Sequence, residues 1–471
     1  MMQPFQRCLM ILADGAREDL FRELLQKGEL PHIEKELVQN GTMATGISVF
    51  PSTTGPAYFP FLTGCFPGTL NVPGIRWFDK EAYANPAKKM VKFRSYVGIE
   101  TFLINRDVQK VPTVFELLPK SYNIFNSVCR GAGSRNLTRI MRIWYWYYAH
   151  LTDRWEFLDQ AALKKTLKAI EKDFEFLFVV LPGIDEYSHL AHPHHEKTIE
   201  QYRFLDTAVG HLIAKLKRLG KWEGTLFWIV SDHGLSKTEN HFCVNAFLNQ
   251  HGLPPFYYPK VFHRRGKKVA NMMSGNGMTH LYFKNGKGWG EPAMRDAIQK
   301  LAPHLLNDLL AQPAVDILAV KSGDQSIDVL SKKGEATLQW KTPASLAYRV
   351  RNQDPFGFQT MPPVLDHQTS LEKTIHTSYP DALWQLAHLF KSSRTGDVVL
   401  SATPGYDLRL EHEIPEHKGS HGSLHREHMA VPIAVNVPLP AKYLRTVDVF
   451  PTLLRLLNKP IPASIDGDSI V

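Results

Sequence analysis

Three long apolar runs, each followed closely by an aspartate, constrain this chain more than any other feature. The runs cover residues 7–13, 174–181 and 225–231. Continuous apolar runs of this length are typical of strands that are buried on both faces, as in parallel sheets. Ligands of such α/β folds gather at the carboxyl ends of the strands. The sequence therefore predicts a mostly parallel sheet with a functional edge, where the aspartates are Asp14, Asp185 and Asp232.

The segment between the second and third runs predicts a helix that crosses from one strand to the next. Its apolar side chains recur at helical spacing, and Gly220 stands where a helix would end. Strands that alternate with such helices build a doubly wound α/β sandwich. The apolar positions of the predicted helix are Ile199, Tyr202, Leu205, Val209, Leu212, Ile213 and Leu216.

A chain of 471 residues exceeds the usual size of a single core, so we expect an α/β core with an inserted region. The alternation breaks near residue 250, where a basic loop precedes a short strand, "THLYF", and a helix near 293–310. The stretches "DILAVKS" and "SIDVLSKKGEATLQW" then alternate as hairpin strands do. We predict a first core part at 1–249, an inserted cap region that extends the sheet at 250–365, and a last core part at 366–471, which includes the strand "DVVLSA".

Composition and charge narrow the class of protein. The formal net charge of +9 suits an anionic substrate, but Lys and Arg are scattered, so no stable nucleic-acid partner is expected. The four cysteines form no CxxC pair, which is typical of a reduced compartment. No apolar stretch approaches the length of a membrane span, and the N-terminal segment is too short and polar-ended for a secretory signal. We therefore expect a cytoplasmic protein.

The segment 142–150 reads "RIWYWYYAH" and is dense in aromatic side chains. Aromatic rings bury a large apolar area, so we interpret this segment as a helix that packs into the core. Contact with a lipid or an aromatic ligand is the alternative interpretation.

Four short segments carry residue types that bind metal ions: "LADG", "IDEYSH", "SDHG" and "GSHG". Each alone is a weak signal, but together with one threonine they offer enough ligands for two divalent ions. Asp185 and His189 are four residues apart, so on a helix they would face the same ion. Adjacent residues Asp232 and His233 would bind one ion or lie between the two. The other candidates in these segments are Asp14 and His421.

Residues 50–64 read "FPSTTGPAYFPFLTG", with Thr53 and Thr54 between a strand-like and a helix-like segment. A threonine in this place either caps a helix or serves as a nucleophile at a helix N-terminus. From residue 52 to residue 69 the chain contains no Lys or Arg. We therefore expect an apolar wall that favours an esterified phosphate oxygen over an additional anionic one. Its members would be Pro56, Tyr58, Phe59, Pro60 and Phe61.

Taken in chain order, Asp, Thr, D-x-x-x-H, D-H-G and G-S-H-G, these motifs resemble the alkaline phosphatase superfamily. The chain is most similar to its type I phosphodiesterase/nucleotide pyrophosphatase family, from "ILADG" to the closing "RTVDVFPTLLRLLNKPIPASIDGDSI". The resemblance implies an alkaline-phosphatase-like three-layer α/β/α sandwich with a mostly parallel central sheet and an inserted cap region. It also implies that Asp14, Thr54, Asp232 and His233 hold one metal ion and that Asp185, His189 and His421 hold the other.

The resemblance implies a function as well. The nucleophile of the family is the second threonine of a P-x-x-T-x-P pattern, which is Thr54 here, so Thr53 would be a turn or capping hydroxyl. We expect metal-dependent hydrolysis of small phosphate esters, most specifically of diesters, through a phosphothreonine intermediate. The two divalent ions would be zinc, with manganese as the alternative. The rival interpretations are a phosphomonoesterase or phosphomutase of the same superfamily and a non-catalytic metal- or phosphate-binding protein.

One departure from the family pattern concerns the residue after Pro56. The family usually has an asparagine there, which donates to a phosphoryl oxygen, whereas this chain has Ala57. The Tyr58 hydroxyl or a backbone N–H would then replace that donor. The related sulfatases have an aldehyde hydrate precursor and an arginine where this chain has Thr54 and Tyr58, so both sulfatase features are missing.

Other residues near the motifs leave alternatives open. Arg76 and Trp77 either line the leaving-group pocket or form a surface ion pair and a core aromatic, and Lys237 and His241 either touch substrate or lie on a solvated loop. The alternatives to His189 as a ligand are His192, His194 and His195, and those to His421 are His417, His425 and His428.

Overall fold

The computed structural model describes residues 5–85, 87, 91–108, 111–139, 141–286, 288–409, 411 and 415–471. Its central element is a seven-stranded sheet in which every strand is parallel to its neighbours except β20. The predicted mostly parallel sheet is therefore confirmed. In spatial order the strands are β21 (Tyr443–Arg445), β2 (Thr42–Ile47), β20 (Ala430–Val435), β7 (Thr225–Val230), β1 (Arg7–Ala13), β6 (Phe176–Leu181) and β5 (Ser121–Ile124).

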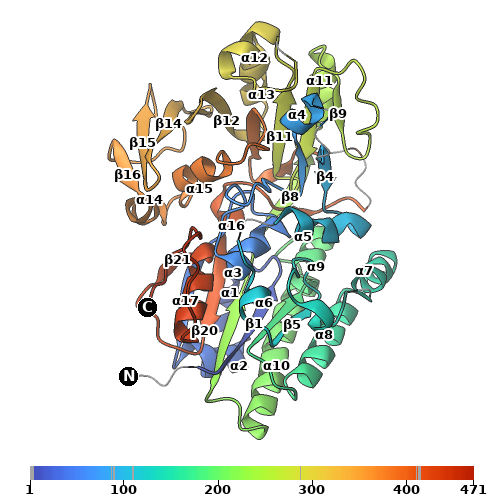
Figure 1. The fold of residues 1–471 in the computed structure, drawn as a ribbon, viewed down its shortest axis with the longest axis vertical. Helices are drawn as coiled ribbons and strands as arrows, with labels where there is room; N and C mark the ends of the chain where they lie inside the picture. The colour runs from blue at the N-terminus through green and yellow to red at the C-terminus, as the bar shows by residue number, and fades with distance from the viewer. Residues whose placement is uncertain are drawn as a thin grey trace.

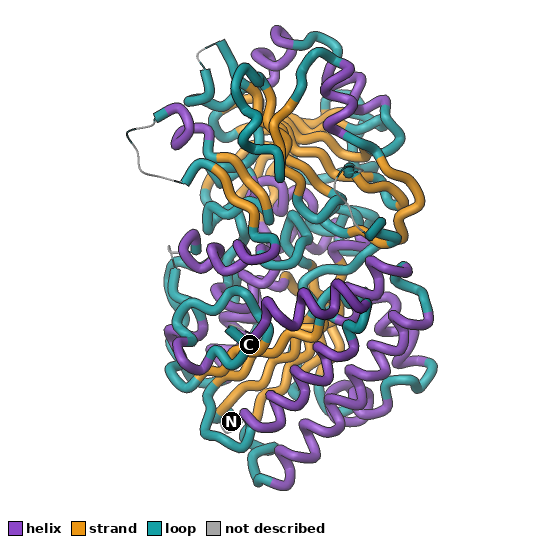
Figure 2. Tube along the Cα trace, turned by 90° about the vertical axis from the view of Figure 1, so that its right-hand side faces the viewer, coloured by secondary structure: helices purple, strands orange, loops and turns teal. Residues whose placement is uncertain are grey.

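Helices cover both faces of this sheet, so the three-layer α/β/α architecture is confirmed (Figures 1 and 2). The predicted crossover helix is α10, whose apolar stripe is buried against the sheet and its neighbouring helices. One face carries α1 (Glu18–Gln26), α2 (Pro31–Ile33), α8 (Glu156–Ala169) and α10 (Glu196–Arg218). The other face carries α3 (Phe59–Thr63), α6 (Val114–Leu117) and α17 (Val449–Leu456).

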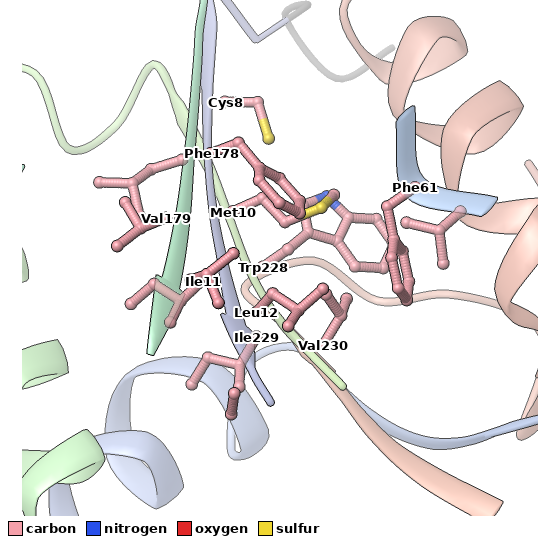
Figure 3. Close-up of a cluster of buried hydrophobic side chains, with 14 of the residues drawn as sticks. Cys8, Met10, Ile11, Leu12, Phe61, Phe178, Val179, Trp228, Ile229 and Val230 are labelled. Carbon is pink, nitrogen blue, oxygen red and sulfur yellow. The ribbon is translucent and has the colours of Figure 1, made fainter. Parts of the chain in front are cut away.

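The core forms because successive side chains of a strand point to opposite faces of the sheet. Met10 lies beside Trp228 in the strand register, and Figure 3 shows both on the side where Phe61 of α3 packs. Ile11 and Val179 lie on the opposite side. All five side chains are almost completely buried, so the central strands bury apolar surface on both faces, as their continuous apolar sequence predicts.

A nine-stranded sheet occupies the other half of the molecule (Figures 1 and 2). The predicted hairpin strands are present as β12, β13 and β14, which pair antiparallel in that order. The strand "DVVLSA" differs from its predicted place in the core, because β17 lies between β12 and β11 in this second sheet. The boundaries of the domains stay a prediction. The strands are β16 (Val364–Asp366), β15 (Ser345–Val350), β14 (Glu335–Thr342), β13 (Ser326–Leu330), β12 (Val315–Gly323), β17 (Val398–Ala402), β11 (Met278–Phe283), β10 (Val269–Met273) and β9 (Pro255–Tyr257).

The helix expected near 293–310 is two helices, α12 (Arg295–Leu301) and α13 (Leu305–Ala311). The break comes at Ala302, which has an extended φ of −150° and precedes Pro303. A residue before proline is disfavoured in the helical region, which explains the interruption.

Two smaller sheets and further short helices connect these parts. The small sheets are β18–β8–β19 and β3–β4, formed by β18 (Gly405–Asp407), β8 (Ser236–His241), β19 (Gly419–Ser420), β3 (Arg76–Phe78) and β4 (Phe93–Ser95). The other helices introduced here are α4 (Lys80–Ala84), α5 (Ile104–Asp107), α11 (Val244–Gln250), α14 (His367–Thr374), α15 (Ala382–Leu389), α16 (Arg426–Met429), η1 (Glu34–Val38), η2 (Pro56–Tyr58), η3 (Gly98–Leu103), η4 (Gly133–Arg135) and η5 (Thr446–Asp448).

The aromatic segment forms helix α7 (Met141–Thr152), which Figure 1 shows at the periphery of the molecule. Its packing into the core is only partial: the Trp144 side chain is 74% exposed and Leu151 is 84% exposed. Trp146 contacts Trp155 edge to face and belongs to the inner side of the helix. The prediction of a core helix is therefore wrong for the outer face of α7.

None of the helices described in the structure has both the length and the apolar character needed to cross a membrane.

Candidate metal and active site

The carboxyl ends of β1 and β7 bring two predicted ligands together. These strands pair in parallel with Leu12 aligned to Val230. Asp14 and Asp232 each stand two residues after this aligned pair, just beyond the ends of the strands, and both are almost fully buried. The N–H of Gly15 donates to Oδ1 of Asp232 at 3.3 Å. The register of the sheet thus places both carboxylates at the predicted functional edge.

His233 and Thr54 complete this first group. His233 Nε2 lies 3.3 Å from Oδ2 of Asp232 and 3.6 Å from Oδ1 of Asp14. The Thr54 hydroxyl lies 3.0 Å from the same Nε2 and 3.5 Å from Oδ1 of Asp14. The ligand atoms of the two aspartates and the histidine lie within 4.8 Å of one another. The four side chains expected to share one ion therefore meet at one place in the structure.

The second group forms around helix α9 (Gly183–Ala191), which follows β6 after one residue. Asp185 stands in its first turn, and Nε2 of His189, one turn later, lies 3.5 Å from Oδ1 of that aspartate. His421, directly after β19, brings a third ligand atom within 4.8 Å of the other two. The His421 ring stacks on the ring of His233 with 3.8 Å between centroids, so the two groups adjoin.

Backbone carbonyls orient all three histidines. Each Nδ1 lies within hydrogen-bond distance of one carbonyl oxygen, so we assign the ring proton to Nδ1 and leave Nε2 available as a metal ligand. The pairs are His189 with Gly419 at 2.8 Å, His421 with Ser52 at 3.0 Å and His233 with Gly234 at 3.2 Å.

Two buried carboxylate oxygens of the metal-ligand groups have no hydrogen-bond partner among the residues that the structure describes. They are Oδ1 of Asp185 and Oδ2 of Asp232. A buried polar atom without a partner is rare and destabilising, and a carboxylate oxygen is a good ligand for a divalent cation. Because one such oxygen belongs to each group, the residues present fit two metal ions.

Burial also shifts the pKa values of these side chains. It raises the pKa of Asp14 to about 6, and burial together with the charge of Asp14 raises the pKa of Asp232 well above its usual range. Burial lowers the pKa of His189 to about 4 and that of His233 to about 3. The histidines are therefore neutral at pH 7, as metal ligands must be, while the crowded carboxylates favour a cation between them.

The alternative histidines lie elsewhere or have other partners. His195 caps α10 and His425 caps α16, each by accepting a backbone N–H. His428 lies between Ser423 and Ser236, whose hydroxyls are 2.8 Å from its Nδ1 and Nε2. His192 ends α9, and neither it nor His194 belongs to the two groups of ligand atoms found among the described residues. His417 lies beside His189, with 4.4 Å between ring centroids.

A pocket of about 410 Å³ opens over both groups. Thr54 is partly exposed there, whereas Thr53 is fully buried. The Thr53 hydroxyl makes no cap, and it has no hydrogen-bond partner in the described part of the chain, so its predicted capping role is wrong. Sequence reasoning missed several residues that line the pocket, because they come from α7, the β10–β11 turn and the loop after β18: Arg142, Trp146, Asn276 and Arg409.

Tyr58 holds a metal-ligand candidate rather than lining the pocket. Its hydroxyl is buried and donates to Oδ2 of Asp14 at 2.5 Å. The backbone N–H of Ala57 donates to Thr53 O and that of Tyr58 donates to Gly55 O, both at 3.0 Å. This placement differs from the predicted contact with substrate, since neither the Tyr58 hydroxyl nor these two amides point to the pocket.

Tyr58→Phe is expected to lower the affinity for metal at the Asp14 group by about tenfold to hundredfold, because it removes the hydrogen bond that orients this ligand. Leaving Asp14 Oδ2 without its donor should also destabilise the protein by about 1–3 kcal/mol. Competition of zinc between the protein and a chromophoric chelator measures the first effect. An unchanged zinc affinity would show that Tyr58 has no influence on Asp14.

The other three residues predicted to contact substrate have different environments. Arg76 lines the pocket. Trp77 is completely buried, donates from Nε1 to the Tyr96 hydroxyl at 3.0 Å, and is a core aromatic. Lys237 is exposed and pairs with Glu239 at 2.7 Å, outside the pocket. Of these three residues, the structure brings only Arg76 to the pocket that holds Thr54.

The apolar wall of the pocket consists of residues other than those expected. The segment from Pro56 to Phe61 is buried in the core, and from this loop Gly55 and the threonines before it reach the pocket. Apolar side chains do surround the pocket, but they come from other loops, from α5 and from α7. They are Ile75, Val97, Ile104, Ile143 and Trp146.

Comparison with solved structures shows the same fold in distant relatives. Human ectonucleotide pyrophosphatase/phosphodiesterase 5 is 14% identical, with a TM-score of 0.59, and the match covers 98% of this chain and 97% of that one. An inactive threonine-to-alanine variant of the murine protein, in complex with AMP, is 13% identical with the same TM-score and coverage. Phosphonoacetate hydrolase from Sinorhizobium meliloti 1021, in complex with phosphonoformate, is 14% identical with a TM-score of 0.56 and covers 97% of this chain and 96% of its own.

Comparison with protein families assigns the sequence itself. Residues 8–424 match the family described as type I phosphodiesterase/nucleotide pyrophosphatase. The match includes every residue of both candidate metal groups and Thr54. The chain is therefore a hydrolase that belongs to the type I phosphodiesterase/nucleotide pyrophosphatase family.

Proposed function

We propose that this protein hydrolyses phosphodiesters with Thr54 as its nucleophile. The observation that carries the proposal is the position of the Thr54 hydroxyl, 3.0 Å from His233 Nε2 and 3.5 Å from Asp14 Oδ1 and partly exposed at the pocket. A threonine hydroxyl is a poor nucleophile at neutral pH unless its environment favours loss of the proton. Thr54 is the hydroxyl of this loop that is both accessible and in contact with a metal-ligand group.

Two divalent ions complete the proposed site, held by the two groups described above. Zinc suits the mixed histidine and aspartate donors, and manganese is the alternative. When bound, such a pair of ions supplies positive charge that favours an ionised nucleophile and neutralises the attacking and leaving oxygens. The carbonyls that hold the three histidine Nδ1 atoms keep each Nε2 aimed at its group.

The proposed reaction has two displacements at phosphorus. Thr54 Oγ1 forms a bond to phosphorus while the bond to the leaving oxygen breaks, and the proton that Oγ1 gives up ends on the leaving alcohol. The other ester group stays on the phosphorylated threonine. Water then attacks the same phosphorus, the bond to Oγ1 breaks, and a phosphate monoester leaves as Thr54 regains a proton. Thr54 is thereby restored, and one water is consumed for each ester bond cleaved.

The names of the structural relatives support this assignment. The murine relative with AMP is described as inactive after a threonine-to-alanine change, which is the outcome expected where a threonine is the nucleophile. The bacterial relative is named as a phosphonoacetate hydrolase, so hydrolysis of phosphorus-containing substrates occurs on this fold.

A non-catalytic binding protein would have no need of an accessible threonine beside a metal group. A phosphomutase would have to retain the monoester product, and the open pocket gives no reason to expect this.

A diester should be a better substrate than a monoester. The wall of Ile75, Ile104 and Ile143 accommodates an esterified group, whereas an additional anionic oxygen against such a wall would lose its hydration. We expect kcat/KM for bis-p-nitrophenyl phosphate to exceed that for p-nitrophenyl phosphate after correction for intrinsic reactivity. The rate of p-nitrophenol release by zinc-loaded protein measures both values. A corrected ratio well below one would identify a monoesterase instead.

A further inference from the structure

Arg76 stands at the edge of the active site, held there by the turn between β10 and β11. Its Nη1 lies 3.5 Å from the carbonyl oxygen of Met273. The next residue of that turn, Ser274, accepts the N–H of Ile75 at 2.9 Å. Gly275 then packs so closely on His421 that a Cβ at this glycine would lie 2.9 Å from the ring. The turn therefore connects Arg76 to the metal-ligand groups, and both line one pocket.

This arginine has no carboxylate partner among the residues that the structure describes. Among the described residues, its Nε is buried without a hydrogen-bond partner, and the long contact to Met273 is the one hydrogen bond of its guanidinium. Four arginines with little exposed side chain show the contrast, because each has a carboxylate at 2.6–3.0 Å. These pairs are Arg17 with Asp19, Arg94 with Asp107, Arg394 with Asp79 and Arg445 with Asp381.

A second arginine, Arg409, lies near Arg76. Burial and the nearby charge of Arg409 lower the pKa of Arg76 to about 10, so the guanidinium still carries its charge at pH 7. Arg409 lines the same pocket. An anion that enters the pocket would therefore be attracted to a partly buried guanidinium for which the described residues supply no carboxylate.

Arg142, another arginine of the pocket, has different neighbours. It is buried, feels the charge of Asp14 and donates from Nε to the carbonyl of Phe125 at 2.9 Å. Arg76 is partly exposed, and its Nη1 contacts the carbonyl of Met273. The two arginines therefore line the same pocket from different elements, β3 and α7.

We propose that Arg76 binds an anionic group of the substrate other than the scissile phosphate, either a carboxylate or a second phosphate. The planar guanidinium can form two parallel hydrogen bonds with either group. This proposal deepens the proposed function, since it names the substrate class as phosphodiesters with an additional anionic group. The same chemistry would serve a carboxylated or a phosphorylated leaving group.

Binding of three related phosphonates to the zinc-loaded protein tests this without turnover. The probes are phenylphosphonate, 4-carboxyphenylphosphonate and 1,4-phenylenediphosphonate, measured by isothermal titration calorimetry. We expect one or both of the probes with an additional anion to bind about tenfold to hundredfold more tightly than phenylphosphonate. Comparison of the two shows whether a carboxylate or a phosphate is preferred.

Variants test whether Arg76 causes the tighter binding of the charged probes. Arg76→Gln should bring the ratio of the dissociation constants to about one and leave phenylphosphonate binding unchanged, while Arg76→Lys should keep part of the preference. Lys237→Gln removes one positive charge outside the pocket and should leave the ratio as in wild type. Thermal unfolding of Arg76→Gln shows whether it is folded, and Arg76→Lys provides the second variant.

The proposal would be overturned if wild-type protein did not bind the charged probes or bound them no more tightly than phenylphosphonate. It would also be overturned if Arg76→Gln kept the tighter binding of the charged probes, or if this variant lost affinity for all three probes equally. Hydrolysis of p-nitrophenyl phenyl phosphate, which has no additional anion, tests the proposed function separately. If wild-type protein binds the charged probes through Arg76 but cleaves no diester, the proposed function is wrong and the anion site remains.

Discussion

Thr54→Ala is expected to lower kcat for a phosphodiester by about 10⁴-fold or more while both metal ions stay bound. The magnitude follows from removal of the group that forms the covalent intermediate, since loss of a nucleophile leaves only binding and electrostatic effects. Asp14, Asp232 and His233 still supply three ligand atoms within 4.8 Å of one another. Steady-state kinetics together with metal analysis of the purified variant measures the two quantities independently.

Thr53→Ala is the matched control, because it removes the neighbouring hydroxyl from the same loop. Thr53 is fully buried and its hydroxyl has no partner among the described residues, so the variant loses a methyl group and no hydrogen bond. We expect kcat within a few-fold of wild type and a loss of stability of about 1 kcal/mol. Thr54→Ser keeps the hydroxyl and should retain part of the activity. The reverse pattern, with Thr53→Ala inactive and Thr54→Ala active, would show that the nucleophile has been assigned to the wrong threonine.

The metal groups could be predicted from the sequence because their signals are local. Each central strand and its aspartate are neighbours in the chain, and parallel strands end at one edge of the sheet. The spacing of Asp185 and His189 places both on one side of α9. His421 comes from a short loop after β19, and the glycines on either side of it in "GSHG", together with the resemblance to a known family, distinguished it from His417, His425 and His428.

The pocket could not be predicted in the same way, because tertiary packing decides which side chains reach it. Arg76 and Trp77 are adjacent on β3, so they point to opposite faces. One lines the pocket and the other is completely buried. Nothing in the sequence shows which face is which. Arg142 comes from a helix whose aromatic residues suggested a core element, and Tyr58 was assigned to substrate although its hydroxyl donates to Asp14.

The second sheet shows a related limit. The sequence of an apolar strand does not show to which sheet the strand belongs. The composition of β17 is like that of the central strands. This strand nevertheless lies between β12 and β11, which are about 80 and 120 residues earlier in the chain. Such long-range pairing depends on the packing of whole layers. The sheet to which a strand belongs is therefore harder to predict than the strand itself.

Removal of metal is the second change with a large expected effect. Chelation should abolish hydrolysis and lower the thermal stability, because Asp185 Oδ1 and Asp232 Oδ2 then remain buried without a partner. A ligand present at about a thousand times its dissociation constant stabilises a folded protein by about 4 kcal/mol, so the melting temperature should fall by several degrees. Activity assays and calorimetric unfolding before and after dialysis against a chelator measure both effects. Addition of zinc should restore the activity and the melting temperature most completely, and manganese is the alternative.

Variants of single groups separate the two sites and make the expectation specific. His189→Ala removes a ligand from the group of Asp185 and His421, so metal analysis should find about one ion fewer per chain while the group of Asp14 still binds. The chelator should then lower the melting temperature of this variant by less than it lowers that of wild type. His195→Ala, which removes a helix cap outside both groups, is the control and should keep the full metal content. Full activity of metal-free wild-type protein would contradict the proposed mechanism, and an unchanged metal content of His189→Ala would contradict the assignment of this histidine.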